Sequence, residues 1–503
     1  MGRAYTYVIL GGGTAAGYAA LEFVKQGFNH GELCIISEEA VAPYERPALC
    51  KGFLLPEEPA RLPFFHTCVG TGQGRHLPRW YRENGVELIL NTKVVKVNLH
   101  EKTLLTEVRE TITYRTLIIA TGARAMKLEE FGVPGSVAPN ICYLRSVDDA
   151  QKLVSVMDSC KTTGGQAVVI GGGYIGMECA AALVDNKLPV TIVFPETHFM
   201  ARLFTPEIAA FYEEYYTKKG VVFKKGTIIA GFERDEKGKV VAVQLDDGTR
   251  LQSDLVVVGV GIRPNVSLFE RQLILDKGGI KVNGKMQTSN SSVYAVGDVV
   301  SFPIKMYGDY RKLEHVEHAR MSAAHAVQAI LAPRDTKDYD YMPSFYSRVF
   351  TLSWQFYGDS TGTCILFGDR ASKKFGAYWV HKGRVVGTFL EGGSKEEYNA
   401  LMRVARDQPE VEDLPLLMTQ GMDFATLHSS QPVAPIERTL RDSLTEGHML
   451  LSAPSISIYQ VVAGLAAAAV VGGFSYWYSR RRKWCFMSYA QFVTFKSFSS
   501  SSR

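Results

Sequence analysis

Paired cysteines and an excess of charge of one sign are what this sequence most clearly lacks. Its eight cysteines form no C-x-x-C or C-x4-C pair, and cysteines spaced in this way over 503 residues do not fit a secreted disulfide framework. The 56 basic residues are nearly matched by 51 acidic residues, and no long basic run precedes Arg480. This balance argues against a nucleic-acid partner. The unpaired cysteines indicate a compartment that does not form disulfides.

The N-terminus lacks room for a cleaved targeting peptide, because an apolar strand begins about five residues into the chain. We therefore expect none. Hydrophobic residues make up 46% of the chain and charged residues 21%, which is ordinary for a protein with a large soluble core. At roughly 100–200 residues per domain, the length predicts about three domains.

A strand, a glycine-rich turn and a helix open the chain. Residues 5–10 are an apolar run of buried-strand type, and a helical stretch follows from about Thr14 to Gln26. A second strand at 33–36 ends just before Glu38 and Glu39. The pattern predicts a βαβ unit that binds a dinucleotide, with candidate contacts from the turn at Gly11, Gly12, Gly13, Thr14, Ala15 and Ala16.

Each small residue of this turn has a physical role. Gly11 permits the tight turn, Gly13 lets the backbone approach a pyrophosphate, and Ala16 allows close packing of the helix on the strand. The helix N-terminus offers free N–H groups to the phosphate. One carboxylate after the second strand binds ribose hydroxyls while the other is a surface charge, and we assign the binding role to Glu39.

The same pattern returns after residue 166. Strands are expected at 167–170 and 190–194, with a helix between them that ends near Val184. The turn supplies the candidate contacts Gly171, Gly173, Tyr174, Ile175 and Gly176. Glu196 follows the second strand, where a carboxylate accepts from a 2′-hydroxyl and repels a 2′-phosphate, so NADH is favoured over NADPH. His198 and Arg202 lie close enough in sequence to weaken that preference.

Further strands complete the predicted architecture. Residues 117–122 and 255–261, the latter ending at the candidate contact Gly261, each read as the last strand of a nucleotide module. Residues 293–298 form a strand that ends at Asp298, and residues 339–392 are rich in strand-forming aromatics. We expect an α/β fold with two Rossmann-type domains, one for FAD and one for NAD, and a C-terminal α+β domain. The expected bounds are 1–147 and 266–335 for the FAD domain, 148–265 for the NAD domain and 336–428 for the C-terminal domain.

Residues 456–478 contain no charge. A helix of this length spans about 34 Å, and the hydrocarbon core of a bilayer is about 30 Å thick. Aromatic residues bracket the segment, and the basic run Arg480–Lys483 follows at once, as at a membrane boundary. We expect a linker at 429–455, a transmembrane helix at 456–478 and a basic flank with a tail at 479–503. The positive-inside rule places the basic flank in the cytosol.

With both turns, residues 120–122 and residues 296–298 in hand, the sequence resembles the FAD/NAD-linked reductases related to glutathione reductase. The resemblance implies that Asp298 contacts the ribityl-phosphate region of FAD. The disulfide members of that superfamily carry a C-x4-C pair near the first FAD helix, whereas the matching region here contains Cys50 alone. A dithiol relay is excluded because no second sulfur is available. Electrons must therefore leave the flavin directly.

A closer resemblance, to the plant monodehydroascorbate reductases, extends from Tyr5 to about Gly393. It rests on residues 43–52, 65–70, 313–320, 345–348 and 353–359. It implies that the enzyme oxidises NADH and reduces the monodehydroascorbate radical to ascorbate, as part of hydrogen peroxide removal. It also implies a membrane-anchored peroxisomal form, whose catalytic body the charge rule places on the matrix side. One departure is Cys50, where the family usually carries serine.

The same resemblance implies the roles of individual residues. Arg320 and Arg348 hold the radical anion, and Tyr346 lies at the flavin. Arg46 and Lys51 contact the FAD phosphates, and Val94 and Arg145 lie near the flavin. Residues near the nicotinamide are Glu314, His315 and Val316.

The sequence leaves two alternative functions open. One is a ferredoxin- or rubredoxin-type reductase, which needs a docking surface for an acidic redox protein. The other is a redox-sensing or scaffold flavoprotein with slow turnover. The paired Arg320 and Arg348 suit a small anion and favour the radical reductase.

Overall fold

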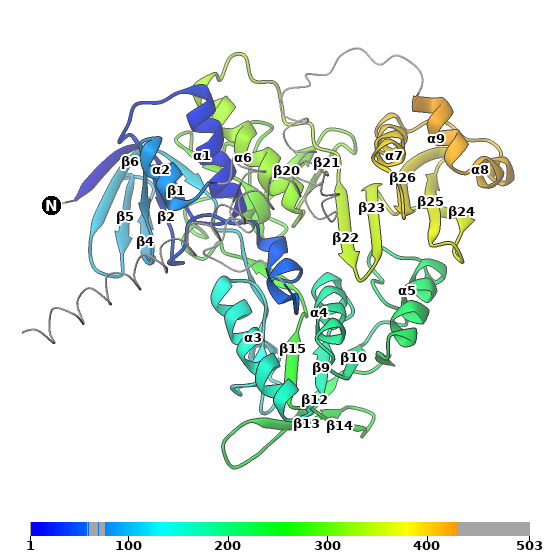
Figure 1. Ribbon diagram of the computed structural model, residues 1–503. Coiled ribbons are helices and arrows are strands. Elements are labelled where there is room, and N and C mark those ends of the chain that lie inside the picture. The colour runs from blue at the N-terminus through cyan, green and yellow to red at the C-terminus, as the bar shows by residue number, and fades with distance from the viewer. Residues whose placement is uncertain (1, 58, 60–68, 70–75, 430–503) are drawn as a thin grey trace, which may run out of the picture. The chain divides into compact units, whose positions relative to one another are not determined.

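The computed structural model describes residues 2–57, 59, 69 and 76–429 (Figure 1). Its first nucleotide module is built on a parallel sheet in the order β3-β2-β1-β6, which β19 extends by pairing with β6. An antiparallel meander of β4, β5 and β6 joins the same sheet. The bounds are β1 Arg3–Leu10, α1 Thr14–Gln26, β2 Leu33–Ile36, α2 Pro78–Glu83, β3 Val86–Ile89, β4 Val94–Asn98, β5 Thr103–Thr106, β6 Thr111–Ile119, β19 Val293–Ala295 and α6 Val316–Leu331.

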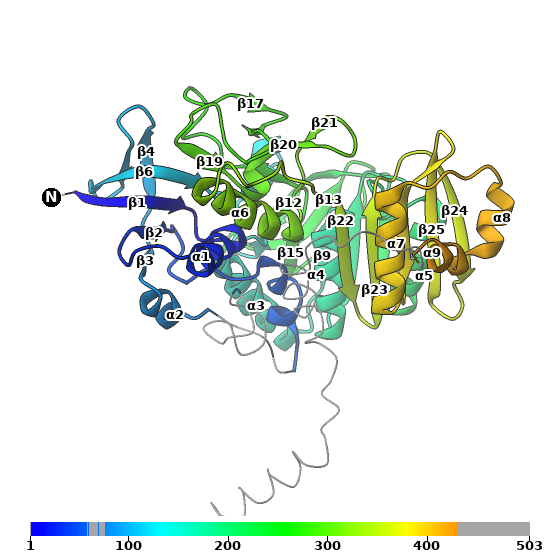
Figure 2. The ribbon, with the colours of Figure 1, turned by 90° about the horizontal axis from the view of Figure 1, so that it is seen from above.

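The first strands of this module form its hydrophobic core. Val8 and Ile9 are fully buried, and each is flanked in register by buried residues of β2 and β6. Helix α6, from far along the chain, lies beside α1 (Figure 2). The predicted strands at 5–10 and 33–36 and the predicted helix from Thr14 to Gln26 are confirmed. The strand predicted at 117–122 is found as the end of β6, which stops at Ile119. Segments before and after the second module therefore build one domain.

The second module is a five-stranded parallel sheet in the order β11-β10-β9-β15-β8. The four residues of β9 and of β15 are all buried, as continuous apolar strands covered on both faces should be. The bounds are β8 Ile141–Cys142, α3 Val147–Thr162, β9 Ala167–Ile170, α4 Tyr174–Asp185, β10 Val190–Phe194, α5 Pro206–Lys218, β11 Val222–Lys225 and β15 Leu255–Val258. The predicted strands at 167–170 and 190–194 are confirmed.

Smaller elements connect and border the two modules. A two-stranded ribbon of β7 and β16 lies where the chain passes between the modules. A three-stranded antiparallel sheet borders the second module, and a four-stranded sheet, β17-β18-β20-β21, follows it in sequence. The bounds are β7 Ala123–Ala125, β12 Ile229–Arg234, β13 Val240–Leu245, β14 Arg250–Gln252, β16 Ile262–Pro264, β17 Leu275–Asp276, β18 Gly279–Lys281, β20 Val300–Ile304 and β21 Asp309–Arg311.

The C-terminal domain is a five-stranded antiparallel sheet in the order β22-β23-β26-β25-β24. Helix α7 packs against β26 and β23 (Figure 2). The bounds are β22 Ser344–Val349, β23 Leu352–Gly358, β24 Thr363–Asp369, β25 Lys374–His381, β26 Arg384–Glu391, α7 Lys395–Asp407, α8 Leu414–Gln420 and α9 Met422–Ser429. The strands expected from the aromatic-rich residues 339–392 are confirmed.

The three parts share one hydrophobic core. Trp354 of the C-terminal sheet is fully buried and packs edge-on against Phe204 of the second module. The Tyr212 hydroxyl donates to the buried Glu391 carboxylate at 2.6 Å. Phe53, from the first module, belongs to the same buried cluster. This shared core fixes the second module and the C-terminal sheet against each other.

Several segments named from the sequence lie outside the described residues. They are residues 65–68 and 70, the expected linker from residue 430 to 455, the expected transmembrane helix at 456–478 and the expected basic flank and tail at 479–503. Within the part of the chain that the structure describes, no helix is both long enough and apolar enough to cross a bilayer.

Candidate active site

The first glycine turn leaves no room for side chains where the chain reverses. Gly11 has a φ of +121°, and a Cβ there would lie 2.2 Å from the Ala120 carbonyl oxygen. A Cβ on Gly12 would lie 2.1 Å from the Ser37 hydroxyl oxygen. Gly13 precedes α1 without any side-chain cap. The first N–H groups of this 13-residue helix are therefore available to an anion.

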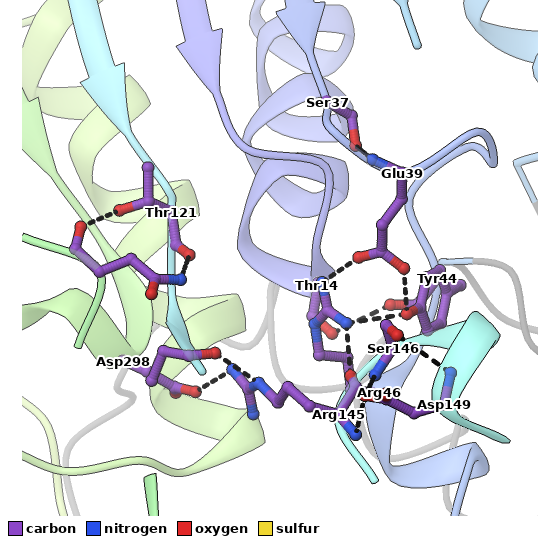
Figure 3. A network of polar contacts seen from close by, with 12 residues as sticks. Thr14, Ser37, Glu39, Tyr44, Arg46, Thr121, Arg145, Ser146, Asp149 and Asp298 are labelled. Atoms are coloured by element: carbon purple, nitrogen blue, oxygen red, sulfur yellow. Dashed lines mark hydrogen bonds and ion pairs between the residues drawn. The ribbon is translucent and has the colours of Figure 1, made fainter. Parts of the chain in front are cut away.

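Glu39 is the carboxylate that faces the site, and Glu38 is the surface charge. The Glu39 side chain is 18% exposed and the Glu38 side chain 72%. Arg46 donates to one Glu39 oxygen at 2.5 Å, and the Tyr44 hydroxyl donates to the other at 2.6 Å (Figure 3). Thr14, at the start of α1, donates to the Tyr44 carbonyl at 3.1 Å. The ribose-binding carboxylate predicted at the end of β2 is thus tied to the glycine turn through Tyr44.

A second part of this network joins three distant segments. Arg145 donates to Asp298 at 2.7 Å and to the Ala123 carbonyl at 2.7 Å, and Arg46 donates to the Arg145 carbonyl at 2.7 Å (Figure 3). The cap of α3 holds Arg145 in place, because Asp149 accepts from the Arg145 backbone N–H at 3.0 Å. The structure therefore brings together Arg46, Arg145 and Asp298, all three of which the sequence predicts near FAD.

The second glycine turn repeats the geometry of the first. Gly171 has a φ of +111°, and a Cβ on it would lie 2.3 Å from the Gly259 carbonyl oxygen. A Cβ on Gly176 would lie 1.9 Å from the Gly171 carbonyl oxygen, so only glycine permits this helix to approach the turn. A Cβ on Gly173 would meet no protein atom within 4 Å. Gly173 therefore borders open space at the N-terminus of α4, where a pyrophosphate would lie.

The other predicted nicotinamide-nucleotide contacts lie around this turn. Glu196 and Arg202 are exposed just beyond β10, and Gly261 has a φ of +117° just before β16. Ile175 lies in the first turn of α4. A Cβ on Gly259 would lie 3.2 Å from its side chain. The Tyr174 ring stacks on Phe345 with centroids 5.7 Å apart, which links this turn to the C-terminal domain.

Sequence reasoning missed Glu178, a buried carboxylate on the helix α4. Lys51 and Ser347 donate to one Glu178 oxygen at 2.7 and 2.6 Å, and the Cys50 thiol donates to the other at 2.6 Å. Burial would lower the pKa of the Lys51 ammonium, but the neighbouring acidic groups outweigh it and raise that pKa. Burial raises the pKa of the Cys50 thiol. The available signal was a single charged residue in the otherwise apolar helix 174–184.

Tyr346 and Arg348 project from one face of β22, because they are two residues apart in a strand. Lys51 lies over the Tyr346 ring, with its Nζ 5.8 Å from the centroid. Burial raises the pKa of the Tyr346 hydroxyl, while the charges of Lys51 and Arg320 oppose that rise. Arg348 is exposed. The partly buried tyrosine therefore lies within electrostatic reach of two cations from the FAD domain.

Arg320 is the most enclosed of the predicted substrate contacts. Its guanidinium lies 3.0 Å from Glu45 and 3.2 Å from Glu317, and it lies over the Tyr18 ring at 5.5 Å. The side chain is only 12% exposed. The neighbouring carboxylates raise the pKa of Arg320 against the effect of burial, so the residue is always charged.

The remaining predicted contacts lie at the start of α6 and in β4. His315 caps α6, packs on Phe345 with centroids 3.3 Å apart, and is buried enough that its pKa falls well below the ordinary value. Its imidazole is therefore neutral. Glu314 pairs with Lys312, Val316 begins α6, and Val94 is a buried residue at the start of β4.

This arrangement of two glycine turns on parallel sheets defines a two-nucleotide oxidoreductase. Residues 5–323 match the family of pyridine nucleotide-disulphide oxidoreductases, and the chain belongs to that family. Residues 342–425 match the C-terminal domain of the monodehydroascorbate reductase 3-like type.

Curated relatives narrow the family. Over 489 residues the chain is 59% identical to monodehydroascorbate reductase 2, peroxisomal, from Oryza sativa subsp. japonica, which covers 96% of this chain and 100% of the relative. Over 488 residues it is 57% identical to monodehydroascorbate reductase 4, peroxisomal, from Arabidopsis thaliana, with 96% and 100% coverage. Within the larger family, the chain is therefore a member of the monodehydroascorbate reductases.

Among solved structures, putidaredoxin reductase in its covalent complex with putidaredoxin is similar at a TM-score of 0.74. The sequence identity is 28%, over 85% of this chain and 99% of the other. The fold is thus shared with putidaredoxin reductase.

The residues present fit FAD in the first module and NADH in the second. Both turns exclude side chains where the backbone reverses, both open a helix without a side-chain cap, and Gly173 borders open space. The chain is an FAD-dependent and NADH-dependent oxidoreductase.

Proposed function

We propose that this protein reduces the monodehydroascorbate radical to ascorbate at the expense of NADH, as part of the ascorbate cycle that removes hydrogen peroxide. The observation that carries the proposal is the Arg320 guanidinium, which is enclosed, charged and still has a free donor. Its buried Nε–H has no hydrogen-bond partner among the described residues. A buried donor without a partner indicates a ligand acceptor.

FAD, when bound, takes two electrons from NADH as hydride and releases them singly, which is what a one-electron acceptor requires. The chain positions the reactants. Arg320 and Arg348 hold the anionic radical, since a guanidinium suits a planar, oxygen-rich anion. Tyr346 lies at the flavin near both the nicotinamide and the substrate. Neutral His315 lies near the nicotinamide without adding charge.

We propose the cofactor contacts from the two turns and from the family resemblance together. For FAD, these are residues 11–16 for the pyrophosphate, Glu39 for the ribose, and Arg46, Lys51, Val94, Arg145 and Asp298 along the phosphates and flavin. For NADH, they are residues 171–176 for the pyrophosphate, Glu196 and Arg202 for the adenosine ribose, and Gly261 and residues 314–316 near the nicotinamide. Lys51 also pairs with Glu178 on α4, which supports a position between the two nucleotide modules.

The test is NADH oxidation by the purified holoenzyme while an oxidase generates the radical continuously from ascorbate. Oxidation that rises with radical concentration and stops when the oxidase is omitted supports the proposal. Oxidation that responds only to an added ferredoxin-like protein supports a ferredoxin- or rubredoxin-type reductase instead. Slow oxidation with every acceptor supports a redox-sensing role.

Replacing Glu196 with glutamine should raise kcat/KM for NADPH relative to NADH by about tenfold. The carboxylate repels a 2′-phosphate, an effect worth about 1 kcal/mol at an exposed site. It also accepts from a 2′-hydroxyl more strongly than the neutral amide that replaces it. Steady-state kinetics with both nucleotides measures the ratio. Glu207→Gln, an exposed charge on α5, is the matched control. An unchanged ratio in Glu196→Gln would remove this residue from the nucleotide site.

We infer the domain bounds given by the sequence: FAD domain 1–147 and 266–335, NAD domain 148–265, and C-terminal domain 336–428. We also infer a linker at 429–455, a transmembrane helix at 456–478 and a basic flank at 479–503. Both curated relatives are named as peroxisomal forms, which supports a peroxisomal membrane location with the catalytic body in the matrix.

The anchor predicts a simple fractionation result. The full chain should remain with the membrane after an alkaline wash, whereas a chain ending at Ser429 should stay in solution. Ala467→Arg should release much of the full chain, since an arginine at the helix centre costs about 2.5–3.5 kcal/mol. Retention of the shortened chain on membranes would contradict the anchor.

A further inference from the structure

Arg320 is enclosed by groups from three segments. Glu45 lies in the loop after β2, Tyr18 lies on α1, and Glu317 lies one turn before Arg320 on α6. The Tyr18 hydroxyl donates to Glu45 at 3.0 Å, and the other Glu45 oxygen lies 3.0 Å from the guanidinium. Glu45 is only 13% exposed. Glu45 is therefore held against Arg320 by a partner of its own.

The position of Glu45 on the guanidinium is specific. Its oxygen lies beside Nη2, whereas Glu317 lies beside Nη1. Nε–H and one Nη2–H point in the same direction, and together they form an edge that a bidentate acceptor can take. Nε has no hydrogen-bond partner within the described part of the chain, and neither has the Glu45 oxygen that faces Nη2. Glu45 is thus an ion-pair partner of Nη2, and among the described residues the Nε–H donor is left without a partner.

The local charge is also unusual for an anion site. One guanidinium faces two carboxylates, Glu45 and Glu317, so the group carries a net negative charge before any substrate enters. An anion that takes the Nε/Nη2 edge must compete with Glu45 for Nη2 and approach a carboxylate of like charge. Like charges in a partly buried site interact strongly because water screens them poorly.

From this geometry we infer that Glu45 is a specificity-determining residue: it competes with the anionic acceptor for the Arg320 guanidinium. This rests on the proposed function of Arg320 in holding the radical. Glu45 keeps the guanidinium in place between turnovers and weakens the hold on any anion. The weaker hold lets the ascorbate product, also an anion, leave. Monoanions are accepted, and acceptors of higher negative charge are disfavoured.

The experiment compares the wild-type holoenzyme, Glu45→Gln and Glu45→Asp in the full chain. Three acceptors are used: the monodehydroascorbate radical, the trianion ferricyanide and a neutral benzoquinone. Each ferricyanide takes one electron, so two are reduced per NADH. The matched control is Glu233→Gln, which neutralises a carboxylate in the exposed pair with Arg250. All assays are run at low ionic strength, where charge effects are largest.

Glu45→Gln should lower KM for the radical by about threefold to tenfold, a tenfold change being about 1.4 kcal/mol. The fall in KM for ferricyanide should be larger. Inhibition by added ascorbate should strengthen in parallel. The neutral quinone provides the baseline, so the ratio of kcat/KM for ferricyanide to that for quinone should rise. Glu45→Asp keeps the charge and should restore most of the wild-type ratio, whereas Glu233→Gln should leave the ratio as it is.

Two outcomes would overturn the inference. If Glu45→Gln raises KM for every acceptor, Glu45 only supports the Arg320 side chain. If the ratio of ferricyanide to quinone does not move, Glu45 does not compete with anions. Failure of the proposed function is a separate result: the wild-type enzyme would then reduce ferricyanide while ignoring the radical, and the ferricyanide ratio would still test Glu45.

Discussion

Replacing Arg320 with alanine should lower kcat/KM for the monodehydroascorbate radical by about 100-fold or more. A charge-assisted hydrogen bond contributes about 1.5–3 kcal/mol, and the Nε/Nη2 edge offers two of them to the anion. The change also leaves Glu45 and Glu317 without their counter-charge, which adds repulsion against the substrate. Steady-state NADH oxidation with continuously generated radical measures the loss.

Two controls separate binding from folding. Arg320→Lys keeps the charge but loses the bidentate edge, so its kcat/KM should fall between those of the wild type and Arg320→Ala. The pair Arg320→Gln with Glu45→Gln removes one buried charge of each sign, and its thermal unfolding should lie closer to wild type than that of Arg320→Ala. Normal kcat/KM for the radical in Arg320→Ala, with full FAD content, would remove Arg320 from the substrate site.

Replacing Gly173 with alanine should weaken NADH binding by about tenfold or more while FAD stays bound. A Cβ there meets no protein atom within 4 Å, so the variant should fold. The methyl group would instead occupy the space through which the pyrophosphate approaches the backbone. Rapid-mixing measurement of flavin reduction by NADH should show an apparent Kd raised by about tenfold or more, which is about 1.4 kcal/mol or more.

Alanine substitutions at two other glycines of the NAD domain provide controls for Gly173→Ala. Gly176→Ala should be worse, since its Cβ would lie 1.9 Å from the Gly171 carbonyl oxygen and the turn itself must shift. Gly231→Ala, on β12, meets only ordinary contacts at 3.5 Å or more and should behave as wild type. A Gly173→Ala enzyme that binds NADH normally would show that the nucleotide does not lie along this turn.

The strands and glycine turns could be predicted because neighbouring residues in the sequence determine them. Strands β9 and β15 are continuous apolar runs and β1 ends in one. Each glycine turn lies between a strand and a helix within a few residues of sequence. The choice between Glu38 and Glu39 is different. Both follow β2, and only the positions of Arg46 and Tyr44 in the fold make Glu39 the inward one.

Contacts between domains could not be predicted from spacing. Lys51, Glu178 and Ser347 are each more than 100 residues from the next in sequence, and nothing in their local patterns pairs them. The resemblance assigned Lys51 to FAD alone, whereas the structure ties it to a carboxylate of the NAD domain. Likewise, Arg320 was predicted as a substrate contact, but its two carboxylate neighbours emerge only when α1, the loop at Glu45 and α6 come together.

The central claim is that two electrons from NADH leave the flavin one at a time to an anionic radical. The most direct test counts radicals consumed per NADH oxidised by the holoenzyme, with the radical followed by electron paramagnetic resonance and NADH by absorbance. The account predicts two radicals per NADH, with both signals lost together in Arg320→Ala. A protein whose flavin NADH reduces, but which leaves the radical to decay at its uncatalysed rate, would contradict it.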